Sequence, residues 1–316
     1  KSCLTSTLPK SASLKMWMEQ ANSLDANGYG RGLITVTPVS LNAFNANPGG
    51  YLYKDASGKY NYDVIMYGTW DSNNIQDISA EAATVTQQYI DAGGAAIFGH
   101  DTICSTSPNF ATLASHVNLS LYNAPTYNGI EEVASGVGAA DQSYISRIKI
   151  TKTGVFTTYP WSIGTEGTIL SVPSCHTSNQ NALGDVWLRY THSIYTDADM
   201  VAPSNFYLTT YLNRAMIQTG HADCAATEDE QKIIANLIFY LADVGVETTA
   251  TDTNVVDIDI PNVATLANNT LNGINGTATI AATDNGTTYK YYVEATEKVS
   301  QAKTTSNIVT HVQTSG

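Results

Sequence analysis

The sequence predicts an α/β domain built on an open parallel sheet, followed by a small all-β domain. Two observations lead to this prediction. Short, nearly continuous apolar runs alternate with helical stretches up to Val246, and the composition then shifts to Thr, Asp, Asn and Val without helical periodicity. Apolar runs of this kind are typical of strands covered on both faces. A chain of 316 residues is long enough for both domains.

The α/β domain is predicted to span residues 1–250 and to open with an N-terminal helical extension of roughly 30 residues. Apolar residues from Ser11 to Leu24 recur at helical spacing, and Asn27-Gly28 follows as a stop signal. The β-branched run Gly32–Val36 then predicts a first strand. The run Tyr62–Gly68 predicts a second.

A strand–helix–strand unit comes next. Ser79–Ala92 has helical spacing and stops at Gly93-Gly94, and the apolar run Ala95–Gly99 follows it directly. Two buried strands joined by a helix form a βαβ unit, in which the strands are parallel. This unit makes the first domain Rossmann-like.

The rest of the domain contains further short strands and closes with a long helix. Thr227 is its predicted N-cap, Glu230 completes a capping box, and Gly245 is the expected end of the helix, which spans Thr227–Val244. The additional predicted strands are Ile148–Thr151, Thr168–Val172, Phe206–Thr210 and Ala215–Gln218.

Residues 251–316 are predicted to form the second domain. Short alternating runs recur at Ala278–Ala281, Tyr289–Ala295 and Asn307–Val312, and Asp284-Asn285-Gly286 is a hairpin signal between the first two. A tail of this kind is typical of an immunoglobulin-like or fibronectin-like β-sandwich.

Composition narrows the function classes. The net charge is −13 and the chain contains no Lys/Arg cluster, which argues against a nucleic-acid partner. Only 14% of residues are charged, and neutral polar residues are abundant, which is typical of secreted proteins. No apolar run reaches the roughly 18 residues that a membrane span requires. We therefore expect an extracellular or cell-surface location, and we expect the chain to be a piece of a longer protein.

Potential glycosylation sites support the same location. Asn-X-Ser/Thr sequons occur at Asn118, Asn268, Asn275 and Asn285.

Several segments carry a family resemblance. In the α/β domain they are Tyr62-Asp63-Val64-Ile65, Phe98-Gly99-His100-Asp101-Thr102, Tyr159-Pro160-Trp161, His176-Thr177, Gly184-Asp185-Val186-Trp187, Asn205-Phe206-Tyr207-Leu208 and Gln218-Thr219-Gly220-His221. In the tail they are Asp284-Asn285-Gly286-Thr287-Thr288-Tyr289 and Tyr291-Tyr292-Val293-Glu294-Ala295. Together they resemble an uncharacterised domain of large surface proteins of Gram-positive bacteria, which is similar to the class I glutamine amidotransferase-like superfold and is often followed by a β-sandwich.

The resemblance implies a fold and a location more than an activity. Amidotransferases use a Cys nucleophile on a sharp strand-to-helix turn, with a His-Glu pair beyond it. Here the corresponding strand ends in Phe98-Gly99-His100-Asp101, and Cys104 comes later. We therefore expect no amidotransferase activity.

Histidine and cysteine residues are predicted to gather at the carboxyl edge of the sheet, where ligands usually bind. One interpretation is a metal site with His100, His176 and His221 as ligands. Another is a hydrolase that uses His100, Asp101, His176 and His221. The interpretation that we favour is structural: Cys3, Cys104, Cys175 and Cys224 form two disulfides in one of three possible pairings.

The sequence thus predicts an extracellular structural or adhesive protein without catalytic activity or a cofactor. Its expected partners are copies of itself in a filament or layer, or other surface proteins. Two alternatives remain open: a metal-dependent hydrolase or carbohydrate-active enzyme at the His-rich edge, and a carbohydrate-binding adhesin that uses Trp70, Trp161, Trp187 and tyrosines.

Overall fold

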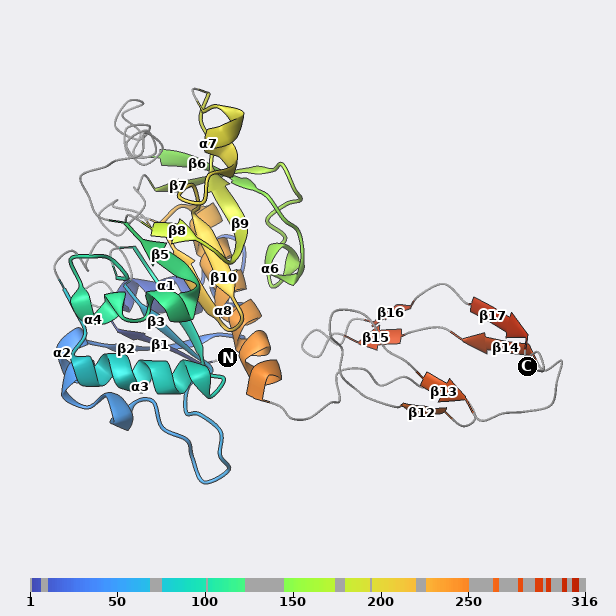
Figure 1. Cartoon of the computed structure of the whole chain (residues 1–316), viewed down its shortest axis with the longest axis horizontal. Coiled ribbons are helices and arrows are strands. Elements are labelled where there is room, and N and C mark those ends of the chain that lie inside the picture. The colour runs from blue at the N-terminus through green and yellow to red at the C-terminus, as the bar shows by residue number, and fades with distance from the viewer. Residues whose placement is uncertain are drawn as a thin grey trace. The chain divides into compact units, whose positions relative to one another are not determined.

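The computed structural model describes residues 2–6, 11–68, 76–100, 102–122, 145–173, 180–193, 195–219 and 226–249, and the short strands β12–β17 after residue 250 (Figure 1). For residues 2–6, 11–12 and 243–249, and for those later strands, the description covers the backbone. The chain divides into two compact units, Lys1–Thr249 and Ala250–Gly316.

A mixed sheet forms the centre of the first unit. Within the described residues it has nine strands in the order β2-β1-β3-β4-β11-β10-β9-β6-β7. The strands are β1 (Ser2–Ser6), β2 (Thr35–Val39), β3 (Val64–Tyr67), β4 (Ala95–Phe98), β6 (Ile145–Ile150), β7 (Ile169–Pro173), β9 (Asp185–Tyr190), β10 (Leu208–Tyr211) and β11 (Arg214–Ile217). Strands β5 (Leu119–Leu121) and β8 (Gln180–Ala182) form a separate antiparallel pair.

The prediction of an α/β fold is confirmed, but the prediction of a parallel sheet holds only for part of it. Strands β2, β1, β3, β4 and β11 are parallel neighbours. Strands β10, β9, β6 and β7 continue the sheet in antiparallel pairs. The reason is visible at Leu212-Asn213, which alone separates β10 from β11: a parallel connection needs a dozen or more residues, so strands this close must form a hairpin.

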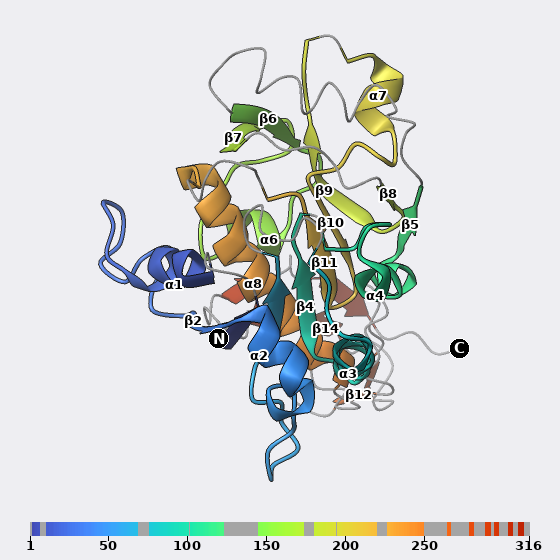
Figure 2. The ribbon, with the colours of Figure 1, turned by 90° about the vertical axis from the view of Figure 1, so that its left-hand side faces the viewer.

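Helices cover both faces of this sheet. Helices α1 (Ser11–Glu19) and α8 (Glu228–Thr249) lie on one side of β4, and α3 (Ala80–Asp91) and α4 (Pro108–Ala111) lie on the other (Figure 2). The remaining helices are α2 (Leu41–Ala46), α6 (Val155–Thr158) and α7 (Asp197–Val201), with the short 3₁₀ helices η1 (Pro48–Gly50) and η2 (Ala114–Val117).

Side-chain caps fix the starts of the two longest helices. The Ser79 side chain accepts the Ala82 N–H at the start of α3, and Thr227 Oγ1 accepts the Glu230 N–H at 3.1 Å at the start of α8. Both helices were predicted at these positions. Helix α8 runs on through Gly245 instead of ending there, because a glycine inside a helix costs only about 1 kcal/mol relative to alanine.

The N-terminal segment differs from the expected helical extension. Residues Ser2–Ser6 form β1, which pairs with β2 on one side and β3 on the other. Helix α1 is also shorter than predicted. The Asn22 side chain accepts the N–H groups of Leu24 and Asp25 at 2.7 and 2.9 Å, and this Asx turn directs the chain away from the helix.

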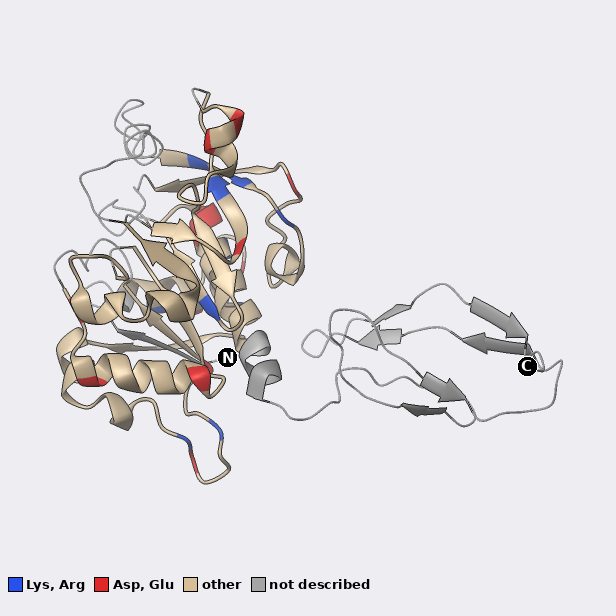
Figure 3. Ribbon diagram, in the orientation of Figure 1, with Lys and Arg blue, Asp and Glu red and all other residues tan. Residues whose placement is uncertain are grey.

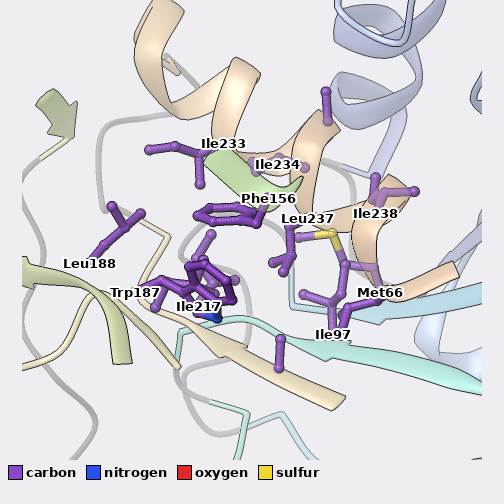
Figure 4. Close-up of a cluster of buried hydrophobic side chains, with 14 of the residues drawn as sticks. Met66, Ile97, Phe156, Trp187, Leu188, Ile217, Ile233, Ile234, Leu237 and Ile238 are labelled. Carbon is purple, nitrogen blue, oxygen red and sulfur yellow. The ribbon is translucent and has the colours of Figure 1, made fainter. Parts of the chain in front are cut away.

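The larger core cluster lies between α8 and the sheet. Ile233, Ile234, Leu237 and Ile238 of α8 pack toward Met66, Ile97 and Ile217 of the strands, with Phe156 and Trp187 beside them (Figure 4). Burying each such aliphatic side chain contributes about 1.5–3 kcal/mol. A second cluster, with Phe98 and Phe110 among its members, fills the space under α3 and α4. The sheet is therefore covered on both faces.

In the second unit the described strands form antiparallel pairs. The pairs are β12 (Ala264–Leu266) with β13 (Ala278–Ile280), β14 (Thr288–Tyr291) with β17 (Val309–Val312), and β15 (Glu294–Thr296) with β16 (Lys303–Thr305). The three predicted runs therefore contain strands. The hairpin predicted at Asp284-Asn285-Gly286 lies outside the described residues; strands β13 and β14 on either side of it pair with β12 and β17.

Charged residues are sparse on the ribbon of the first unit (Figure 3). Among the described residues, no helix is long and apolar enough to cross a membrane.

Candidate functional site

His100 lies at the carboxyl end of β4, directly after a glycine that the fold requires. The Gly99 N–H donates to the Tyr67 carbonyl at 2.8 Å, and a Cβ at residue 99 would lie 1.7 Å from the Gly68 carbonyl oxygen. The ends of β3 and β4 therefore approach too closely for any side chain at this position. His100 itself is only 1% exposed.

Other polar side chains are buried at the same edge. We call the set the buried edge cluster; it consists of His100, Thr102, Cys104, Gln180, Gln218 and Thr219. His100, Thr102 and Cys104 follow β4, Gln218 and Thr219 follow its parallel neighbour β11, and Gln180 begins β8.

Gln180 links the segments that meet in this cluster. Its Nε2 donates to the Ile103 carbonyl, and its Oε1 accepts a hydrogen bond from Gln218 Nε2 at 3.1 Å. Thr102 Oγ1 donates to the Gly99 carbonyl at 2.7 Å. These side chains use their polar groups to hold the chain together, as buried polar groups usually do.

Most of the other predicted site residues lie outside the described residues. These are Asp101, Cys175, His176, His221 and Cys224, and for Cys3 only the backbone of β1 is described. The described residues that border their loops, namely Ile103, Gln180 and Gln218, are brought together by the hydrogen bonds of Gln180. Strand β7, which precedes residue 174, lies four strands from β11, or roughly 19 Å at the usual strand spacing.

The described residues contain neither a candidate metal site nor a disulfide. No group of three or more His, Cys, Asp or Glu there could hold a metal ion. No disulfide is present there either, where Cys104 is the one cysteine with a described side chain. The Cys104 thiol lies 3.1 Å from Thr106 Oγ1 and 3.5 Å from Ser107 Oγ.

The side chain of Glu230, predicted only as part of a helix cap, is buried between α8 and the sheet. Tyr207 Oη donates to Glu230 Oε1 at 2.6 Å, and both residues are fully buried. The ring of Tyr190 packs edge-on against that of Tyr207. The capping-box pattern indicated a helix start at Glu230 but gave no signal for this contact, which depends on where β10 passes beneath α8.

The predicted carbohydrate-binding aromatics are not presented as flat open faces. Trp187 is 4% exposed, and its Nε1 donates to Thr210 Oγ1 at 2.8 Å. Trp161 is partly buried, with the Arg31 guanidinium and the Lys232 ammonium 5.1 and 5.5 Å from its ring centroid. Trp70 lies outside the described residues.

One predicted glycosylation site is described. Asn118 is half-buried at the end of η2, in a left-handed conformation with φ of 56°. Asn268, Asn275 and Asn285 lie outside the described residues.

Exposed apolar side chains gather at the opposite edge of the sheet, where the sequence predicts no site. Leu183, Tyr211 and Leu212 are 59%, 39% and 52% exposed. The turn at Leu183-Gly184 lies against the end of β10, since a Cβ on Gly184 would lie 3.4 Å from that of Tyr211. We call these three residues the tip patch. Leu212 has a φ of 53°, a conformation that costs a residue with a side chain about 1–2 kcal/mol.

Comparison with known proteins adds no assignment: no protein-family model matches the chain, and no curated protein matches it.

Proposed function

We propose that this protein is an extracellular structural or adhesive cell-surface module that acts through protein–protein contacts and not through catalysis. The observation that carries the proposal is the burial of His100 within the buried edge cluster. A catalytic base must come within about 2.6–3.2 Å of the proton that it removes. A side chain with 1% exposure cannot meet a substrate unless the surrounding chain moves.

The tip patch provides the contact surface in this proposal. Exposed apolar side chains that lie together are a feature of protein contact surfaces, in which tyrosine is enriched. Leu212 keeps its exposed side chain in a conformation that glycine or asparagine would adopt at lower cost. Strain of this kind is commonly retained where a residue serves a function. We take the partner to be a second copy of the chain.

We propose further that the first unit is a Rossmann-like domain related to the class I glutamine amidotransferase-like superfold. The order of its parallel strands, β2-β1-β3-β4-β11, supports this, because it matches the 2-1-3-4-5 order of doubly wound folds. The antiparallel pairs of the second unit are compatible with the proposed immunoglobulin-like sandwich.

A hydrolase or carbohydrate-active enzyme is the second candidate. It is favoured by one observation: the chain segments after β4 and β11 leave the same edge of parallel strands, where ligands bind in doubly wound folds. Activity against a panel of ester, peptide and glycoside substrates that is lost in His100→Ala would support this candidate over the structural one.

The contact proposal is tested by sedimentation velocity of the full chain over a wide concentration range. We expect the wild type to self-associate and Leu212→Asn to weaken that association about tenfold or more. Because asparagine tolerates the left-handed conformation, this variant should be more stable by about 0.5–1 kcal/mol, so unfolding would not explain the loss.

Leu24→Asn is the matched control, since Leu24 is 46% exposed in the turn that follows α1. It should associate like the wild type. A wild type that stays monomeric throughout, or a Leu212→Asn variant that associates equally well, would overturn the proposal.

A further inference from the structure

The two outermost strands of the main sheet are both closed by side chains. In the part of the chain that the structure describes, strand β2 ends the sheet on one side and β7 on the other. An outermost strand normally presents unpaired N–H and C=O groups, to which a strand of another molecule can add. In this protein side chains of helices and of a helix cap occupy those groups at one residue of each strand, Val36 and Ser171.

Helix α1 closes β2 at Val36. The Val36 N–H donates to Glu19 Oε1 at 2.6 Å, and Lys15 Nζ donates to the Val36 carbonyl at 3.1 Å. Lys15 and Glu19 also form an ion pair with each other at 2.6 Å. Both polar groups of Val36 therefore point away from β1 and are satisfied by a single pair of side chains.

Helix α8 and its N-cap close β7 in the same way at Ser171. The Ser171 N–H donates to Asp229 Oδ2 at 2.8 Å, and Thr227 Oγ1 donates to the Ser171 carbonyl at 2.7 Å. In the pairing of β6 with β7, Ser171 lies opposite Arg147.

A proline lies two residues after Val36 and two residues after Ser171. Backbone polar groups of a strand alternate in direction, so the residue two positions along faces the same way. That residue is Pro38 in β2 and Pro173 in β7. Proline has no N–H and cannot complete a strand ladder, and it is largely confined to sheet edges for this reason.

We infer that Lys15 with Glu19, and Thr227 with Asp229, guard the two edges of the sheet against strand addition by a second copy of this chain. The same device, an acidic side chain on the outward N–H followed by a proline, occurs at both ends although the two edges share no sequence. The guards keep the sheet edges out of self-association, which leaves other surfaces to mediate it.

The test compares Glu19→Ala with Glu19→Gln in the full chain, both carrying Leu212→Asn so that contacts of the tip patch do not contribute. Glutamine retains an oxygen that can accept the Val36 N–H, whereas alanine removes it. We expect Glu19→Ala to associate at about tenfold lower concentration than Glu19→Gln in sedimentation velocity, since strand addition adds backbone hydrogen bonds.

Hydrogen exchange identifies the surface involved. In Glu19→Ala the peptide containing Val36 should exchange faster than in the parent at low concentration and regain protection at high concentration. The corresponding pair for the other edge is Asp229→Ala and Asp229→Asn, read at Ser171.

Glu228→Ala is the matched control: it removes the acid of the Lys232–Glu228 ion pair, which has the same i,i+4 spacing as the Lys15–Glu19 pair. It should behave like the parent. Circular dichroism confirms that each variant is folded. The inference is overturned if folded Glu19→Ala and Asp229→Ala associate no more than their amide counterparts, or if Val36 regains no protection on association.

Discussion

Buried polar side chains account for much of the specificity of this fold at the level of single residues. Tyr67 is an example: it lies in β3, fully buried, with its hydroxyl hydrogen-bonded to Thr86 Oγ1 of α3. Its ring stacks on Phe98 and meets Phe110 edge-on. Burial raises the pKa of the Tyr67 hydroxyl well above its usual value near 10.

This shift predicts a loss of stability in alkali. Because the pKa of Tyr67 is higher in the folded than in the unfolded protein, its contribution is complete below the unfolded pKa of about 10 and is lost as the pH rises above it. One such group contributes a slope of up to about 1.4 kcal/mol per pH unit.

Urea unfolding measures this slope when it is repeated between about pH 8 and pH 11. This range includes the pKa of about 10 that tyrosine has in the unfolded protein. Tyr67→Phe should be less stable at pH 8 by about 1 kcal/mol, because it loses a buried hydrogen bond. Its free energy of unfolding should then fall less steeply with pH than that of the wild type. Thr86 still donates to the Ala82 carbonyl at 2.7 Å in this variant, so no donor is orphaned. Parallel curves for the two proteins would contradict the assignment.

At the level of elements, the sequence was most informative where a long apolar run met a recognisable cap. Ser79 and Thr227 mark the starts of α3 and α8, and the strands β3 and β4 follow from continuous apolar runs. Strand β1 was missed because Ser2–Ser6 is short and mostly polar, and its place in the sheet is decided by its neighbours β2 and β3.

The candidate site was predictable only in part. His100 could be placed at the carboxyl edge because it ends an apolar run that follows a helix. Gln180 and Gln218 gave no such signal, since they are separated by 38 residues and only the tertiary structure brings them together. The side chains that guard Val36 and Ser171 could not be predicted for the same reason, because they lie on helices or helix caps distant in sequence from these strands.

Asn236 ties helix α8 by hydrogen bonds to α6 and to the loop after it. Its Nδ2 donates to the carbonyls of Phe156 and Trp161 at 2.7 and 2.8 Å, and its Oδ1 accepts the Trp161 N–H at 2.9 Å. Asn236 is fully buried, so water cannot replace these contacts. We predict that Asn236→Ala lowers the free energy of unfolding by about 3 kcal/mol, the cost of leaving such groups unsatisfied.

Equilibrium urea unfolding of the variant tests this value. The control is Gln231→Ala on the same helix, whose amide makes a local contact with the Ala226 carbonyl at 3.1 Å and should cost less than about 1 kcal/mol. Asn236→Asp should also destabilise strongly near neutral pH, because a carboxylate accepts hydrogen bonds but donates none. Equal stability of the two alanine variants would show that Asn236 does not secure the loop.

At the level of the whole molecule, the strength of self-association depends on two opposing effects: charge repulsion between copies and apolar contact between them. The net charge of −13 makes two copies repel one another at low salt. The tip patch, by contrast, presents Leu183, Tyr211 and Leu212 for a contact that salt does not weaken. The guards that we propose at Val36 and Ser171 keep the edges of the main sheet out of this balance.

This balance predicts that the wild type self-associates more strongly as salt increases. Between 0.1 M and 1 M NaCl the screening length falls from about 10 Å to about 3 Å, which removes most of the repulsion between exposed charges. Sedimentation velocity at both salt concentrations should therefore show a lower dissociation constant of the dimer at about 1 M NaCl than at about 0.1 M. Leu212→Asn should respond much less, because screening alone supplies no attraction. If salt instead weakens association, ion pairs and not the tip patch hold the copies together, and the contact must lie elsewhere on the surface.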